Sequence, residues 1–314
     1  MKKIIFIVGP TAVGKTDIAF ILAKEINGEI ISCDAMQVYK EINIASNKPS
    51  QKILQGIPHH LINIISAEEE FDVAQFNRLA QGAIKEIHKK NHIPIIVGGS
   101  GMYMQILLDG IFEAKGKRDD SLREQLKQEA QEKGTRSLYD TLQKKDPQAA
   151  LKIHPNDLRR IIRALEVLAL EKKPISQIQK NRQGLWGKYA IHLFGLTRER
   201  KDIYQRIEAR VEEMFKEGIV EEIKGLKLAQ WSHTADRIIG VREIQGYLKG
   251  EYDMERAKYL MKLNTRHLAK KQLTWFRKEK RIHWIVMNSN ETNESVVKKI
   301  MKEADEGGAI CLTQ

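Results

Sequence analysis

Three short runs of apolar residues alternate with helical patterns in the first hundred residues. The runs are KKIIFIVG at 2–9, EIISCD at 29–34 and IPIIVGG at 93–99. Between them, apolar residues recur every three or four positions over 18–26 and over 76–87, which is the spacing of one buried helix face. Asp72 and Gln75 predict a capping box at the start of the second helix. Continuous apolar strands joined by helices predict a parallel sheet that is covered on both faces.

The pattern changes after Gly110. From about 116 to 186 we find no convincing strand pattern, and charged helices dominate, among them one with an apolar stripe over 158–168. Strand patterns return at YAIHLFGL (189–196) and RIHWIV (281–286). We therefore predict an α/β fold. A core with a parallel β-sheet flanked by helices (1–115 and 187–314) is interrupted by an all-helical insertion domain at 116–186.

Charge and cysteine content narrow the class of protein. The formal net charge is +12 and the isoelectric point is about 9.5, which favours a polyanion such as nucleic acid as partner. No apolar stretch is long enough to suggest a membrane partner. The two cysteines, Cys33 and Cys311, form no CxxC pair, so a disulfide framework or a cysteine zinc site is not expected. We expect a cytoplasmic monomer.

The clearest motif is GPTAVGKT at 9–16, between a predicted strand and a predicted helix. In this context it is a phosphate-binding P-loop: glycines let backbone N–H groups face an anion, and the helix N-terminus adds positive charge. Lys15 would reach a terminal phosphate, and the Thr16 hydroxyl would bind Mg²⁺. The expected diphosphate-binding loop comprises Gly9, Pro10, Thr11, Ala12, Val13, Gly14, Lys15 and Thr16.

A second polar element is less specific. A P-loop NTPase usually carries an acid at the end of another strand, but the run at 93–99 ends in glycines, whereas the run at 29–34 ends in Asp34. If that strand neighbours the first, Asp34 would face the phosphate site, where it could hold Mg²⁺ through water or act as a base. A turn or capping role stays open. In GGSGMY (98–103), glycines would allow a ligand close to the backbone and Ser100 could donate to it, or the segment is a plain turn.

Several longer segments together indicate a family. They are ISCDAMQVYKEINIASNKP, IPHHLINI, PIIVGGSGMYM, IHPNDLRRIIRALEV, IIGVREIQGYLKGE and NTRHLAKKQLTWFRK. With the P-loop, this series resembles the bacterial type of the tRNA dimethylallyltransferase, or isopentenyl-tRNA transferase, family from the P-loop to about residue 286. The resemblance implies a prenyltransferase with a P-loop core and a helical insertion. Its donor is dimethylallyl diphosphate, and its acceptor is the exocyclic amine of the adenosine immediately 3′ of the anticodon, in tRNAs that read codons beginning with U.

The resemblance also implies residue roles. Asp34 would be the base that takes a proton from the adenine amine, and Gln37 would read the adenine edge. The departing diphosphate would be stabilised by the P-loop amides, by Lys15, by Thr16 with Mg²⁺, and by Ser100 and Arg123. The tRNA anticodon stem-loop would contact both parts of the protein.

Two basic helices are candidates for the tRNA surface, one at 158–167 with Arg159 and Arg163 four positions apart, and one within 256–281. Residues 256–281 carry ten lysines and arginines against one acid, Glu279, a density that suits phosphate contacts. Trp275 and Phe276 in this segment are expected in the core. His59 and His60 have no acidic or cysteine partner at metal-ligand spacing, so structural use or RNA contact is expected. The expected tRNA-binding residues are Asp34, Ala35, Met36, Gln37, Arg159, Arg160, Ile161, Ile162, Arg163, Arg266, Lys270 and Arg277.

Two other functions fit parts of the sequence. The first is a P-loop kinase or NTPase that acts on a small molecule or nucleotide, which the missing acid on the run at 93–99 disfavours weakly. The second is a non-catalytic RNA-binding protein with a vestigial P-loop, which the intact Lys15, Thr16 and Asp34 disfavour.

Overall fold

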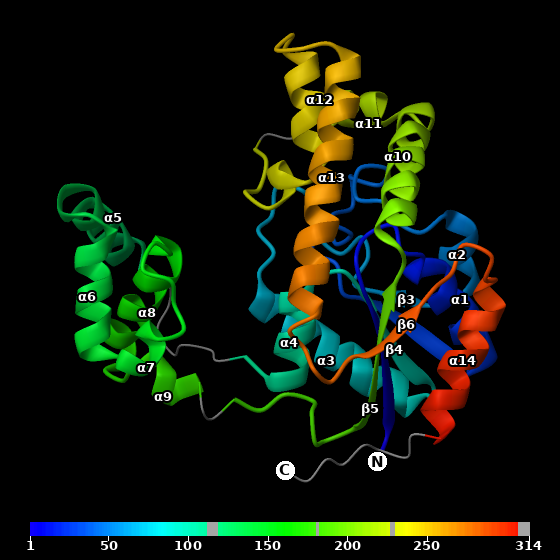
Figure 1. Cartoon of the computed structure of the whole chain (residues 1–314), viewed down its shortest axis with the longest axis horizontal. Helices are drawn as coiled ribbons and strands as arrows, with labels where there is room; N and C mark the ends of the chain where they lie inside the picture. Colours follow the sequence, from blue (N-terminus) through cyan, green and yellow to red (C-terminus); the bar gives the residue numbers. More distant parts are fainter. Residues whose placement is uncertain (112–118, 180–181, 227–229, 307–314) are drawn as a thin grey trace. The chain divides into compact units, whose positions relative to one another are not determined.

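The computed structural model describes residues 1–111, 119–179, 182–226 and 230–306. The predicted boundary at 115–116 and Cys311 lie outside these ranges. The chain divides into two compact units, Met1–Leu108 with Leu185–Gln314, and Asp109–Gly184. The second unit is continuous in sequence and interrupts the first. Figure 1 shows the sheet of the first unit and the helices of the second.

The first unit is built on a six-stranded sheet in the order β3-β2-β4-β1-β5-β6, and all neighbours pair in parallel. Its strands are β1 (Lys3–Val8), β2 (Gly28–Ser32), β3 (His59–His60), β4 (Ile93–Gly98), β5 (Ala190–Thr197) and β6 (His283–Val286). This confirms the predicted fold class, and five of the strands match predicted runs. The short edge strand β3 was not predicted, because two histidines carry no strand pattern.

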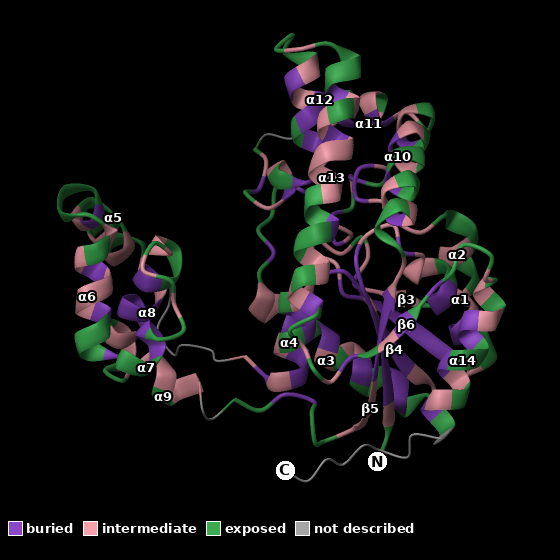
Figure 2. Cartoon of the chain, in the orientation of Figure 1, coloured by how far each residue is buried: buried purple, intermediate pink, exposed green. Residues whose placement is uncertain are grey.

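Both faces of the sheet are buried, and β1 shows why its apolar run is continuous. Phe6 packs with the face covered by α3 (Val73–Lys89) and α4 (Gly101–Asp109). Ile5 and Ile7 pack with the other face, under α1 (Lys15–Glu25) and α14 (Asn293–Glu306). The buried residues follow the centre of the sheet in Figure 2. Helix α3 begins with the predicted capping box, in which Asp72 accepts from the Gln75 N–H at 2.8 Å and donates its own N–H to the Gln75 side chain at 2.9 Å.

The other helices of the first unit follow the ends of strands or pack on one another. They are α2 (Gln51–Gly56), α10 (Arg200–Lys216), α11 (Ile219–Gly225), η2 (Ala235–Arg237), α12 (Val241–Leu248) and α13 (Met254–Phe276). Helix α13 contacts both α10 and α12. Within the described ranges, no helix is long and apolar enough to cross a membrane.

The second unit is helical in all its described elements. They are α5 (Asp120–Lys133), α6 (Thr135–Lys145), α7 (Pro147–Ala150), α8 (Leu158–Glu171) and α9 (Ile175–Ile178). The predicted stripe on α8 supplies the centre of its core, where Ile161 is 0% and Ile162 is 6% exposed. We had expected both to contact tRNA. That expectation is wrong for their side chains, because they are the apolar face that holds this small unit together.

Candidate functional site

The carboxyl ends of the parallel strands meet at one edge of the sheet. The P-loop follows β1, Asp34 follows β2, and the glycine turn follows β4. The sequence placed Asp34 at this edge on the condition that β2 neighbours β1. The two strands are not neighbours, because β4 lies between them, but Asp34 still reaches the shared edge since every strand runs the same way.

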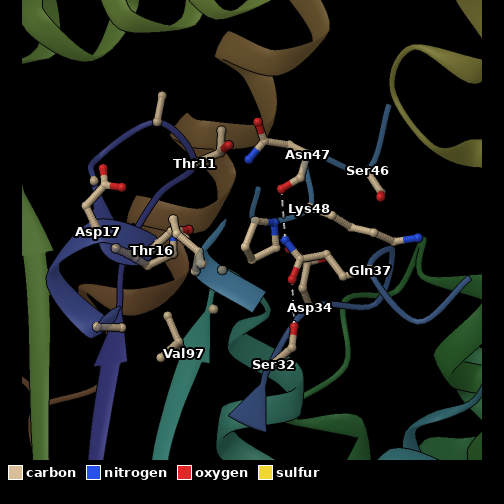
Figure 3. Close-up of a pocket in the computed structure, with 18 of the residues that line it drawn as sticks. Thr11, Thr16, Asp17, Ser32, Asp34, Gln37, Ser46, Asn47, Lys48 and Val97 are labelled. Carbon is tan, nitrogen blue, oxygen red and sulfur yellow. Dashed lines mark hydrogen bonds between the residues drawn. The ribbon is translucent and has the colours of Figure 1, made fainter. Parts of the chain in front are cut away.

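A cavity of about 610 Å³ opens at this edge. It is lined by Thr11, Ala12, Gly14, Lys15, Thr16, Asp17, Ala19, Ile30, Ser32, Asp34, Gln37, Ser46, Asn47, Lys48, Pro49, Ser50, Ile53, His59, Ile62, Val97, Gly98, Gly99, Arg206, Ala209, Arg210 and Gln272. Figure 3 shows Thr11, Thr16 and Asp17 on one side of the cavity, facing Gln37, Asn47 and Lys48 on the other. The structure thus brings the predicted P-loop and Asp34 to a common space.

Backbone conformation shapes the P-loop. Gly9 has φ +148°, and a Cβ there would lie 2.5 Å from the Leu196 carbonyl oxygen of β5. Gly14 precedes α1 with φ 106°, in the left-handed region that favours glycine. The two glycines of the motif therefore allow close contact with β5 and a sharp entry into the helix.

Three arginines that the sequence analysis missed donate hydrogen bonds to this loop. Arg206 of α10 donates to the Ala12 carbonyl at 2.8 Å, and Arg198 donates to the Val13 carbonyl at 3.0 Å. Arg210 donates to the Thr11 hydroxyl at 2.9 Å. In a trans peptide the C=O and the following N–H point in opposite directions. The N–H groups that follow Ala12 and Val13 therefore point away from these guanidinium groups.

Lys15 is folded back over its own loop. Its Nζ donates to the Gly9 carbonyl at 3.1 Å and to the Pro10 carbonyl at 2.7 Å. Burial lowers the pKa of Lys15 to about 8; the charge of Asp34 opposes this shift, and the charge of Arg210 adds to it. The ammonium group is therefore held where its charge is costly, and an anion in the cavity would stabilise it.

Asp34 is held in place by its own turn. Its Oδ1 accepts the Met36 N–H at 2.8 Å. Burial raises the pKa of Asp34, opposed by this N–H and by the charge of Lys15. A carboxylate that is oriented by a backbone N–H and has a raised pKa is a stronger proton acceptor than an ordinary aspartate. The turn role of Asp34 is present, and the residue also lines the cavity. Its role as a base stays a prediction.

Polar residues form the side of the cavity opposite the P-loop, and hydrogen bonds hold them in place. The Gln37 side chain accepts from the Ser32 hydroxyl at 2.8 Å and donates to the Asn47 carbonyl at 3.1 Å, as Figure 3 shows. Lys48 donates to the Tyr39 carbonyl at 2.5 Å, and burial lowers the pKa of Lys48 to about 8.

A carboxylate from α11 also holds the loop that leads into this side of the cavity. The Glu222 carboxylate of α11 accepts the N–H groups of Asn43, Ile44 and Ala45 at 2.7 to 3.1 Å. Three N–H donors on one carboxylate hold this part of the loop in a fixed conformation.

The glycine turn after β4 serves packing more than ligand approach. A Cβ at Gly98 would lie 2.0 Å from the Cys33 carbonyl oxygen, and one at Gly101 would lie 2.2 Å from the Trp275 ring. Gly98 and Gly99 line the cavity, whereas Ser100 is not among the lining residues. The role of Ser100 toward the diphosphate stays a prediction.

Arg123 lies in the helical unit, where Glu166 fixes it. Its Nε and Nη2 donate to the two Glu166 oxygens, both at 2.8 Å, and Arg163 adds a third bond at 2.7 Å. Although burial alone would raise it, these bonds hold the pKa of Glu166 down to about 2. Both Arg123 and Arg163 are thus engaged within their own unit, while Arg159 and Arg160 are exposed. Their roles toward diphosphate and tRNA stay predictions.

Helix α13 presents part of the predicted basic surface. Lys270 and Arg277 are exposed, and Arg266 pairs with Glu208 at 3.3 Å. Phe276 is 0% exposed and Trp275 packs partly buried against the main core, which confirms the expected packing of both aromatics.

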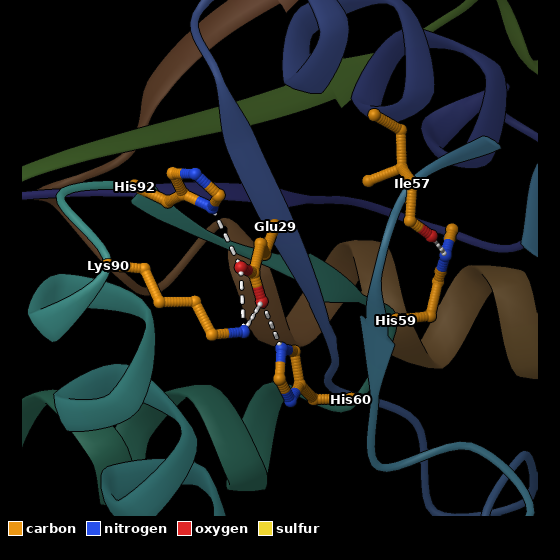
Figure 4. Close-up of polar contacts among 6 residues, drawn as sticks. All are labelled: Glu29, Ile57, His59, His60, Lys90 and His92. Carbon is orange, nitrogen blue, oxygen red and sulfur yellow. Dashed lines mark hydrogen bonds and ion pairs between the residues drawn. The ribbon is translucent and has the colours of Figure 1, made fainter.

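The two histidines of β3 have separate surroundings (Figure 4). His60 bonds the buried Glu29 carboxylate at 2.7 Å, together with Lys90 and His92. His59 bonds the Ile57 carbonyl at 2.7 Å and lines the cavity. The structural role predicted for His60 is confirmed. Among the residues that the structure describes, no group of three or more His, Cys, Asp or Glu could hold a metal ion.

Comparison with known proteins decides the family. The model of the IPP transferase family matches residues 37–279. The chain belongs to this family. A tRNA dimethylallyltransferase of Carboxydothermus hydrogenoformans is 44% identical over 304 residues, covering 96% of this chain and 97% of that protein. One of Halothermothrix orenii is 42% identical over 306 residues, covering 96% and 93%.

Solved structures of family members share the fold. The tRNA isopentenylpyrophosphate transferase of Bacillus halodurans has a TM-score of 0.71 at 37% identity, covering 98% of each chain. A eukaryotic dimethylallyltransferase acting on tRNA has a TM-score of 0.80 at 27% identity, covering 100% of this chain and 87% of that one. The resemblance found in the sequence is thereby confirmed, and the matches favour prenyl transfer over the kinase or NTPase alternative.

Proposed function

We propose that this protein transfers the dimethylallyl group of dimethylallyl diphosphate to tRNA and releases diphosphate. The acceptor is the exocyclic amine of the adenosine immediately 3′ of the anticodon, in tRNAs that read codons beginning with U. One observation carries the proposal: the same cavity is lined by the P-loop, which suits a diphosphate, and by Asp34, which suits a proton acceptor. The family's tRNA-modifying members support the choice of acceptor.

The residues of this chain fit a displacement. The adenine nitrogen attacks the allylic carbon, and the carbon–oxygen bond to the diphosphate breaks with its electron pair on oxygen. The amine proton passes to the Asp34 carboxylate. An adenine amine is a weak nucleophile because its lone pair is delocalised into the ring, so a base contributes directly to the rate. Asp34 is already oriented for this task by the Met36 N–H.

Departure of the diphosphate is favoured by positive charges that are already in place before the reaction. Lys15 and Arg210 line the cavity on the P-loop side, and fixed cations lower the cost of a developing negative charge. The Thr16 hydroxyl and the Asp17 carboxylate line the same side, and they are oxygen ligands of the kind that Mg²⁺ accepts beside phosphate oxygens. When bound, Mg²⁺ would neutralise part of the diphosphate charge.

The test is transfer of label. The protein is incubated with Mg²⁺, unmodified tRNA and labelled dimethylallyl diphosphate, with ATP in a parallel reaction. Label in tRNA supports the proposal, and consumption of ATP without labelled tRNA refutes it. Position-specific digestion of the product shows whether the label is on the adenosine next to the anticodon.

A variant then tests the base. Asp34→Asn keeps an oxygen that can accept the Met36 N–H but cannot take a proton, so we expect transfer to fall by about 10²- to 10⁴-fold with tRNA affinity little changed. Asp305→Asn is the matched control, because Asp305 is exposed and pairs with Lys3 far along the chain. Normal turnover in Asp34→Asn would remove Asp34 from this role.

A further inference from the structure

Helix α13 places one uncharged polar side chain, Gln272, in the wall of the cavity. Its Oε1 accepts the Thr11 N–H of the P-loop at 2.8 Å. A backbone N–H can only donate, so this bond settles which end of the amide faces the loop. The NH₂ group of Gln272 must therefore face the other way.

The NH₂ group of Gln272 lies against the glycine turn. A Cβ at Gly99 would be 2.4 Å from its Nε2, so only glycine at this position leaves the amide its place. Among the hydrogen bonds of the described residues, none has Gln272 Nε2 as donor, although Gln272 and Gly99 both line the cavity. Two N–H donors are therefore positioned beside residues that line the cavity, with no acceptor among the described residues.

The order of the strands shows where Gln272 lies relative to the P-loop and Asp34. Gly99 follows β4, which lies between β1 with the P-loop and β2 with Asp34. Gln272 thus lies at the strand end between the group that would hold the leaving diphosphate and the group that would take the proton. The Thr11 N–H already donates to Gln272 Oε1 and so cannot donate to a ligand. The NH₂ group of Gln272 can donate in its place. An amide that accepts on one end donates more strongly on the other.

We propose that Gln272 is a diphosphate-binding residue: its NH₂ group donates to an oxygen of the diphosphate while its carbonyl keeps the Thr11 amide in place. This inference rests on the proposed function for the identity of the substrate. A pure donor suits an anionic oxygen and does not suit the adenine amine, which is itself a donor. Gln272 belongs to α13, whose basic residues we expect to contact tRNA, so the same helix would touch both substrates.

Substitutions separate the donor from the loop contact. Gln272→Glu keeps an oxygen for the Thr11 N–H but replaces the donor with a second, charged acceptor. Gln272→Met removes both functions at similar size. We expect Gln272→Met to weaken binding of inorganic diphosphate with Mg²⁺ by about 10- to 100-fold, the range of a hydrogen bond to a charged group, and Gln272→Glu to weaken it more. The KM for dimethylallyl diphosphate should rise in parallel.

The control is Gln81→Glu, because Gln81 lies on α3, bonds the Asn77 side chain at 3.1 Å and does not line the cavity. Its diphosphate affinity should equal that of the unmodified protein. Thermal unfolding midpoints of all variants show whether a loss reflects misfolding.

A second variant reaches the same amide from the other side. Gly99→Ala should displace the Gln272 side chain and reproduce the loss of diphosphate affinity. Combined with Gln272→Met, it should add little, because the interaction is already gone. Fully additive losses would overturn the inference.

The decisive measurement is calorimetric binding of inorganic diphosphate without tRNA. Weaker binding in Gln272→Glu supports the inference, and unchanged binding overturns it and leaves only a loop contact. If the unmodified protein binds diphosphate but labels no tRNA, the proposed function fails while the assignment of Gln272 as a diphosphate ligand is still decided by the same titration.

Discussion

Lys15 makes the binding of diphosphate depend on pH in a range where an ordinary lysine would not. Its pKa is lowered to about 8 by burial. Lys15 is therefore charged in about nine-tenths of the molecules at pH 7 and in about one-tenth at pH 9. If the charged form binds, the apparent affinity for dimethylallyl diphosphate falls roughly tenfold between these values. With the ordinary value of 10.5, the affinity would hardly change.

The sign follows from which form the ligand stabilises. A bound diphosphate favours the ammonium group and raises the pKa of Lys15 in the complex. Binding at pH 9 should therefore take up about one proton per site. Titration calorimetry in buffers of different ionisation enthalpy measures this number directly, and KM for dimethylallyl diphosphate at pH 7 to 9 measures the affinity change.

Lys48 supplies the necessary control, because burial also lowers its pKa to about 8 and it lines the same cavity. Lys48→Met should keep the alkaline loss of affinity. Lys15→Arg stays charged and should abolish it. A flat KM in the unmodified protein, or an alkaline loss that survives Lys15→Arg, would refute the assignment.

Three further predictions concern separate parts of the protein. Glu166→Gln should destabilise the helical unit by about 3 kcal/mol, which follows from the difference between the ordinary pKa of 4.5 and the value of about 2. Because folding lowers this pKa, the stabilisation should be lost as the pH falls from about 4.5 to 2. Hydrogen exchange of this unit, measured against pH, can follow the loss. Gly98→Ala should destabilise the core unit by at least 1–3 kcal/mol, since its Cβ would lie 2.0 Å from the Cys33 carbonyl oxygen; an unchanged unfolding midpoint would show that the turn can move. Arg266→Glu with Lys270→Glu should weaken tRNA binding and flatten its salt dependence, and an unchanged slope would place the RNA surface elsewhere.

The sequence was sufficient for most of the strands and for the position of the P-loop. Apolar runs located five strands, and the P-loop motif located one side of the cavity because the pattern is local: glycines, a lysine and a helix N-terminus within eight residues. The order of the strands could not be predicted, because nothing in the run at 93–99 indicates that this strand lies between the first two strands. The error at Ile161 and Ile162 came from treating a whole segment as a contact surface, although its apolar stripe already predicted burial.

Residues that join the site from distant segments were missed for a common reason. Arg206 and Arg210 are four apart on a helix rich in both charges, which looks like a solvated face in the sequence. Gln272 is one polar residue inside a basic helix. Only the fold shows that these side chains meet the P-loop, because their hydrogen-bond partners lie about 190 to 260 positions away in the sequence.

The clamp on the loop at 43–45 has a mechanical consequence. Glu222, which holds it, lies on α11, and the arginines that hold the P-loop lie on or just before α10. The two helices are joined through Gly218, whose φ is 93°. Two consecutive helices therefore contact the loops on both sides of the cavity. Changing the angle at Gly218 should alter the width of the site without touching any residue that lines it.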